Sequence, residues 1–77
     1  MLYKENFSQR LATLRRDRKL SLQQLGDAIG KTNQAISLFE KGRGLPSFEV
    51  LCHLADYFDV SIDYLVGRSD DPMAHKR

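Results

Sequence analysis

Apolar residues recur at helical spacing along most of the chain and divide it into five segments. The first stripe, formed by Phe7, Leu11 and Leu14, predicts a helix over residues 7–19. Similar stripes predict helices over residues 22–29, 32–42, 48–58 and 62–66. Because no stretch shows convincing period-two alternation, the pattern contains no strand and predicts an all-α domain.

Capping residues fit the ends of these segments. Ser21 and Gln24 have the spacing of a capping box, in which both side chains accept hydrogen bonds from backbone amides of the first turn. Residues 1–6 are expected to be a frayed lead-in, with Asn6 or Ser8 near the first cap. Other expected N-caps are Thr32, Ser47 and Ser61, and glycines expected to end helices are Gly30, Gly42 and Gly67.

The turn between the second and third helices is short. Only Lys31 and the cap Thr32 follow Gly30 before the next helix begins, so the two helices are expected to cross steeply, as in a helix-turn-helix motif. Gly26 lies inside the second helix, where glycine costs about 0.5–1 kcal/mol relative to alanine. Its presence there predicts that the following helix packs closely over this backbone.

The helix expected over residues 32–42 separates apolar from polar side chains. At about 100° per residue, Ala35, Ile36 and Phe39 face one side, and Asn33, Gln34, Ser37 and Lys41 face the other, with Leu38 at their edge. Amides can bind adenine N6 and N7 together, and a helix N-terminus favours phosphate. The pattern fits a DNA-recognition helix, and it also fits an ordinary amphipathic surface helix.

Charge is distributed unevenly along the 77 residues, although the net charge is only +2. Residues 1–43 contain nine Lys or Arg against four Asp or Glu, whereas residues 44–71 contain one Arg against six acids. This asymmetry suggests one surface that faces phosphates and another that faces away. No apolar run is long enough for a membrane span and no signal peptide is evident, so a cytoplasmic location is expected.

The sequence offers no constellation for metal binding or catalysis. Cys52 is the only cysteine, and His53 and His75 have no further ligand at a suitable spacing, so no metal, cofactor or small-molecule substrate is expected. Cys52 fits a partly buried small hydrophobe, with a redox sensor as the alternative. The chain is predicted not to be an enzyme. Residues 1–67 are expected to form the domain, and residues 68–77, which are polar, a flexible tail.

Several short motifs occur together in a recognisable order: Leu14-Arg15, Leu20-Ser21, Leu25, Ile29-Gly30, Ile36-Ser37, Glu40, Gly42, Pro46-Ser47 and residues 60–65, Val-Ser-Ile-Asp-Tyr-Leu. With these, the chain resembles the Cro and phage-repressor type of helix-turn-helix regulators, also called the xenobiotic-response-element family. The resemblance covers residues 7–67. It implies a five-helix lambda-repressor-like fold, double-stranded operator DNA as the ligand, and a homodimer.

The resemblance also implies roles for individual residues. The positions that match base-reading residues are Asn33, Gln34, Ser37 and Leu38, and those that match phosphate contacts are Thr32, Lys41 and Arg43. Arg15 and Glu40 match a salt bridge that holds the recognition helix in place. Apart from the resemblance, four residues near the last two helices are candidates for a dimer patch: Phe58, Val60, Ile62 and Tyr64. Of these, Val60 and Tyr64 are the expected dimer contacts, whereas Phe58 and Ile62 are expected in the core.

Two positions depart from the family pattern. Leu22 occupies the place of a phosphate-binding glutamine, and Gln23 or Lys31 is the candidate to replace that contact. Leu38 is apolar where many relatives carry a polar or basic reader. It either meets a thymine methyl group or is simply tolerated at the rim of the interface.

The sequence thus predicts a transcriptional regulator, specifically a repressor, that binds a near-palindromic operator as a dimer. One alternative is an antitoxin that binds its own operator and inhibits a protein partner. Another is a helical protein-interaction module that no longer binds DNA, which would show no salt-dependent DNA affinity. An enzyme is the least favoured class.

Overall fold

The fold is described from a computed structural model, which describes residues 3–73. In this part of the chain there are five helices and no strands, which confirms the predicted all-α class. The helices are α1 (Tyr3–Asp17), α2 (Leu22–Ile29), α3 (Asn33–Glu40), α4 (Phe48–Phe58) and α5 (Ile62–Leu65).

The connection from α2 to α3 follows the local signals in the sequence. Ser21 and Gln24 form the predicted capping box at the start of α2, and Gly30 ends this helix in the left-handed conformation with φ 74°. A backbone does approach Gly26 closely, as predicted, but it belongs to the turn before α3 and not to α3 itself: a Cβ built at Gly26 would lie 2.5 Å from the carbonyl oxygen of Lys31. The absence of a side chain at Gly26 therefore allows the turn to cross directly over α2.

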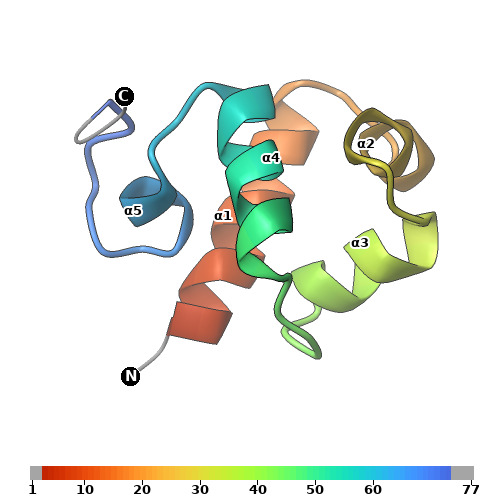
Figure 1. The fold of residues 1–77 in the computed structure, drawn as a ribbon, viewed down its shortest axis with the longest axis horizontal. Helices are drawn as coiled ribbons and strands as arrows, with labels where there is room; N and C mark the ends of the chain where they lie inside the picture. The colour runs from red at the N-terminus through yellow and green to blue at the C-terminus, as the bar shows by residue number, and fades with distance from the viewer. Residues whose placement is uncertain (1–2, 74–77) are drawn as a thin grey trace.

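One hydrophobic core joins all the helices. Its fully buried residues come from every helix: Phe7 and Leu11, Leu25, Ile36, Leu54 and Leu65. The α3 helix packs against α1 and α2, and α5 packs against α1 and α4. As a result α5 lies on the opposite side of the molecule from α2 and α3 (Figure 1). This arrangement leaves one long side of α3 at the surface.

The N-terminal prediction was wrong in part. The frayed lead-in was expected to extend to Asn6, but α1 already begins at Tyr3. Asn6 packs against the chain beyond α5, because a Cβ built at Gly67 would lie 2.5 Å from the Asn6 Cβ atom. Ser8 is buried inside the helix, where its hydroxyl donates to the Glu5 carbonyl oxygen at 2.8 Å and caps nothing. Tertiary packing extends the helix beyond its apolar stripe.

Residues 68–73 run back along the domain. The Ser61 amide donates to the Pro72 carbonyl oxygen at 2.8 Å, and the Arg10 guanidinium binds the Ser69 carbonyl oxygen at 3.2 Å and the Asp70 carboxylate at 2.8 Å. A flexible tail over residues 68–77 stays a prediction, and its last four residues lie outside the described part of the chain. Of the helices described, none is both long and apolar enough to cross a membrane.

Candidate nucleic-acid interface

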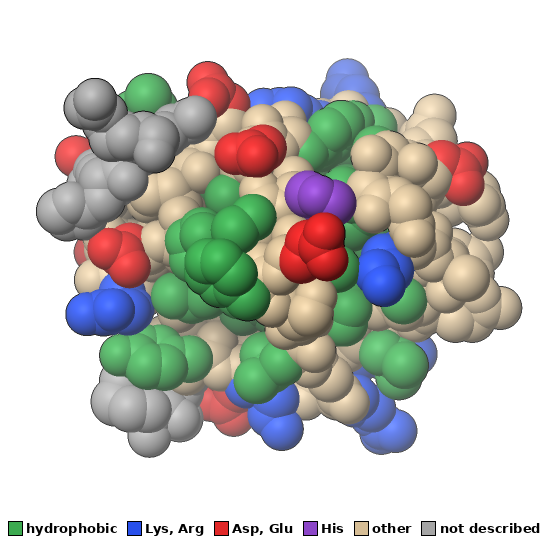
Figure 2. Space-filling view, viewed as in Figure 1, with side chains coloured by type: hydrophobic (Ala, Val, Ile, Leu, Met, Phe, Trp, Pro, Cys, Tyr) green, Lys and Arg blue, Asp and Glu red, His purple; other side chains and the backbone are tan. Residues whose placement is uncertain are grey.

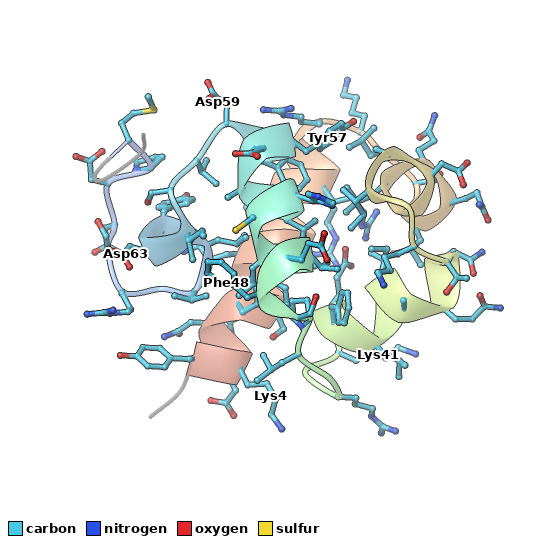
Figure 3. All side chains as sticks on the ribbon, viewed as in Figure 1. Lys4, Lys41, Phe48, Tyr57, Asp59 and Asp63 are labelled. Atoms are coloured by element: carbon cyan, nitrogen blue, oxygen red, sulfur yellow. The ribbon has the colours of Figure 1, made fainter. Side chains whose placement is uncertain are left out.

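The surface side of α3 carries the predicted base-reading residues. Gln34 is exposed, Leu38 is 47% exposed, and Asn33 and Ser37 are half-buried. Ile36, on the other side of the helix, is fully buried. Lys41 follows directly at the C-terminal end of α3 and is exposed (Figure 3). The four base-reading candidates and Lys41 therefore share one accessible side of a helix.

The start of α3 is suited to an anion. Thr32 is the N-cap, and its hydroxyl oxygen accepts a hydrogen bond from the Ala35 amide at 3.1 Å. A threonine hydroxyl that accepts in this way still has its own proton to donate. Exposed Lys31 adds a cation next to this cap, where the helix dipole is positive. Phosphate can thus meet a hydroxyl donor, a cation and the helix N-terminus together.

An ion pair fastens the other end of α3 to α1. The Arg15 Nε atom lies 2.6 Å from Glu40 Oε2, and the Arg15 Nη2 atom lies 2.9 Å from Glu40 Oε1, so the pair is bidentate. Arg15 also donates to the Leu20 carbonyl oxygen at 2.8 Å. These bonds connect α1, the turn before α2, and α3, and they restrict how α3 can rotate.

Burial and hydrogen bonding explain the electrostatics of this pair. The two side chains are only 15% and 10% exposed. The hydrogen bond with Glu40 raises the pKa of Arg15 above its ordinary value, although burial acts in the opposite direction. Arg15 consequently stays charged at any pH at which the domain would be used.

The loop after α3 presents Arg43 to solvent. Its backbone amide donates to the Leu38 carbonyl oxygen at 2.9 Å, and Gly42, which was expected to end the helix, has a left-handed backbone with φ 72°. Together these features reverse the chain directly after the helix. Arg43 and Lys41 are both exposed, close to the end of the surface side of α3.

The two departures from the family pattern have different structural settings. Leu22 is half-buried and packs against the hydrophobic core, so its replacement of glutamine supplies apolar contacts. Gln23 is exposed, but its side-chain amide donates to the Asp27 carboxylate at 2.8 Å. A phosphate contact from Gln23 would have to share that amide with an anion, whereas the Lys31 side chain has no hydrogen-bond or ion-pair partner within residues 3–73.

Two basic residues that sequence reasoning left unassigned bind other helices. Arg18 donates to the carbonyl oxygens of Tyr57 and Phe58, at 3.1 and 3.0 Å, and so caps the C-terminus of α4. Arg10 donates to the Tyr64 carbonyl oxygen at 3.1 Å and lies 4.1 Å from the centre of the Tyr64 ring. The positions of Arg10 in α1 and of Arg18 just after it gave no signal for such distant partners.

The expected dimer contacts do not form one exposed patch. Val60 is only 7% exposed and belongs to the core, and Tyr64 is half-buried beneath Arg10. The most exposed large apolar side chains in the described residues are Phe48, at 72%, and Leu45, at 61%. Figure 2 shows a group of apolar side chains near the centre of the view, where Figure 3 labels Phe48 on α4.

Groups with potential metal or redox chemistry form no metal-binding cluster in the described part of the chain. Within residues 3–73, no three His, Cys, Asp or Glu side chains gather in a way that could hold a metal ion. Cys52 is half-buried and His53 is exposed, both on α4. His75 lies outside the described residues.

Comparison with known families decides the classification. Residues 11–65, well over half of the chain, match a family model described as "Helix-turn-helix". The chain belongs to the helix-turn-helix family. The predicted family is therefore confirmed, and the turn between α2 and α3 is the element that gives the family its name.

Relatives of this helix-turn-helix chain include two bacterial proteins. It is 38% identical over 66 residues to YobD of Bacillus subtilis, named an uncharacterized HTH-type transcriptional regulator. The match includes 86% of this chain and 59% of YobD. The chain is 38% identical over 60 residues to RstR of Vibrio cholerae, named a cryptic phage CTXphi transcriptional repressor, and covers 54% of it with 78% of its own length. The chain thus spans somewhat more than half the length of these relatives.

A solved structure supports the same fold. The P22 c2 repressor protein, crystallised in complex with a synthetic operator, superimposes with a TM-score of 0.74 at 32% sequence identity. The match covers 77% of this chain and 89% of the repressor chain.

Proposed function

We propose that this helix-turn-helix domain binds double-stranded DNA in a sequence-dependent way and acts as a transcriptional regulator. The observation that carries the proposal is the surface side of α3, where Gln34, Leu38 and Lys41 are exposed together on a helix held by the Arg15–Glu40 pair. A rigid helix with an accessible polar side is what insertion into a major groove requires.

The residues divide into two groups by the part of DNA that they contact. Phosphates bind to exposed cations and to the α3 N-terminus, and these contacts supply most of the affinity and its salt dependence. The phosphate group comprises Thr32, Lys31, Lys41 and Arg43, with Gln23 as a further candidate. Base edges bind to Asn33, Gln34, Ser37 and Leu38, where a well-placed bidentate amide contributes about 1–3 kcal/mol of discrimination.

The domain acts as a repressor when a dimer occupies an operator. Two copies of α3 in successive major grooves lie roughly 34 Å apart on a near-palindromic site. Relatives named as repressors, one of them crystallised with an operator, support this role. Of the two dimer contacts inferred from the sequence, Tyr64 retains exposed surface, whereas Val60 contributes mainly to the core.

Selection from random duplex DNA tests the proposal. The expected result is an enriched motif with two-fold symmetry and half-sites about 10 base pairs apart. The control is a variant with Gln34 and Lys41 replaced by Ala and Gln, which leaves the buried side of α3 intact and should enrich no motif. Enrichment of no sequence by the unchanged protein, together with no salt-dependent DNA affinity, would overturn the proposal.

A further inference from the structure

Leu38 is an apolar side chain on the proposed groove-facing side of α3. It lies one helical turn after Gln34 and one turn before Lys41, so the three side chains follow one another along the same side. Among the residues of α3 it is the only large apolar side chain counted as exposed, at 47%. An apolar group thus interrupts a polar row.

Packing within the domain does not explain Leu38. The neighbouring apolar residues of α3 face inward: Ile36 is fully buried, and the Phe39 ring lies 6.1 Å from that of Phe7. Leu38 is neither in the core cluster nor among the partly buried residues that pack against it. Its carbonyl oxygen accepts the Arg43 amide at 2.9 Å, which fixes the backbone from which the side chain projects.

Base chemistry in the major groove offers one apolar partner. Thymine presents a C5-methyl group there, whereas the other bases present only hydrogen-bond donors and acceptors. A leucine inserted among those polar edges would desolvate them without replacing their hydrogen bonds, and beside a methyl group it would bury apolar surface on both partners.

We propose that Leu38 makes the domain select thymine at one base pair of each half-site by contacting its C5-methyl group. One helical turn advances 5.4 Å and one base pair about 3.4 Å, so this thymine lies within about two base pairs of the pair contacted by Gln34. The inference rests on the proposed function, and it assigns to Leu38 a base that the function alone does not specify.

Deoxyuridine provides the test, because it differs from thymidine only by lacking the methyl group. Each thymine of the selected duplex is replaced singly, and dissociation constants are measured at one salt concentration for the unchanged protein and for Leu38→Ala. The unchanged protein is expected to lose about fourfold in affinity at one thymine per half-site. Leu38→Ala is expected to bind the thymine and deoxyuridine duplexes equally well at that position.

The matched control is Leu45→Ala, which removes an exposed leucine from the loop after α3 and should retain the deoxyuridine effect. Both leucines are exposed, so the unfolding midpoints of the two variants should stay close to that of the unchanged protein, and these midpoints are measured alongside. Loss of the methyl effect in Leu38→Ala alone supports the inference. The inference is overturned by an equal deoxyuridine effect in the unchanged protein and in Leu38→Ala, by no such effect at any thymine, or by a selected half-site without thymine. In each of these cases a symmetric selected motif would still support DNA binding.

Discussion

At the scale of single residues, a substitution in the Arg15–Glu40 pair can distinguish an effect on the position of α3 from an effect on the stability of the domain. Replacing Glu40 with Gln keeps one acceptor for the guanidinium but removes the bidentate, charge-assisted geometry. We expect the free energy of unfolding to fall by about 1–3 kcal/mol. DNA affinity, corrected for the folded fraction, should fall further, because α3 then has to be ordered on binding.

Urea unfolding and DNA titration on the same preparations measure both effects of Glu40→Gln. Glu49→Gln serves as the control, since Glu49 is an exposed glutamate in the first turn of α4, away from this pair. If the loss of folded protein accounts for the whole loss of DNA affinity in Glu40→Gln, the pair acts only as an ordinary structural contact.

Gly26 gives a second prediction at this scale. An alanine Cβ there would lie 2.5 Å from the Lys31 carbonyl oxygen, and that oxygen belongs to the backbone of the turn. Because the turn must shift, Gly26→Ala should lower the free energy of unfolding by about 1–3 kcal/mol. DNA affinity should fall with it, since the same turn sets the start of α3.

Gly44→Ala is the matched control for this substitution. Nothing lies within 4 Å of a Cβ built at Gly44, and its backbone is not left-handed. Thermal unfolding should show Gly44→Ala unchanged or slightly stabilised, because alanine restricts the unfolded chain more than glycine does. Similar losses in both variants would show that clash with the turn is not the cause.

At the scale of helices, the sequence predicted the elements whose ends carry local signals. Ser21, Thr32, Ser47 and Ser61 are N-caps as expected, since each hydroxyl accepts an amide hydrogen bond three residues later. The start of α1 was missed because packing of Asn6 near Gly67, some 60 residues away, extends that helix. Local rules cannot anticipate such a contact.

The candidate interface was likewise predictable where local spacing decides the position of a side chain, and not where distant contacts decide it. Helical spacing alone placed Ile36 inside and Gln34 and Lys41 outside, as the structure shows. Spacing could not show that Val60 would be buried, because the side chain of a turn residue can point to the core or to a partner equally well. It also could not show that Arg18, just after α1, caps α4.

Arg18 therefore supports a prediction about the α1–α4 connection. Arg18→Ala removes two hydrogen bonds to the last carbonyl oxygens of α4 and the stacking of the guanidinium on Phe58, at 5.1 Å. We expect the unfolding midpoint to fall by about 4–8 °C, which corresponds to about 1 kcal/mol. DNA affinity of the folded protein should stay within about twofold.

Arg16→Ala provides the comparison, because Arg16 is an exposed arginine in the last turn of α1, two residues before Arg18. Its effect on the unfolding midpoint should be smaller, as for most surface substitutions. A weaker salt dependence of DNA binding in Arg18→Ala would show that Arg18 also meets phosphate.

At the scale of the whole molecule, the location of the cations proposed to meet phosphate gives the domain a preferred orientation toward DNA. The basic residues proposed to meet phosphate lie around α3, whereas α5, with Asp63 in its first turn, lies on the opposite side (Figure 1). Cations gathered around α3 attract DNA to that side, so they favour one orientation of the domain during encounter.

A matched pair of arginines tests this orientation. Each phosphate that a cation neutralises contributes about 0.9 to the slope of log K against log salt concentration. Arg43→Gln should lower that slope by about 0.9 for one bound copy and by about 1.8 for a dimer, so the same measurement also counts copies. Arg68→Gln should leave the slope unchanged, because Arg68 follows α5 and lies 3.8 Å from Asp63. Equal changes for both substitutions would mean that net charge alone, and not an oriented surface, governs binding.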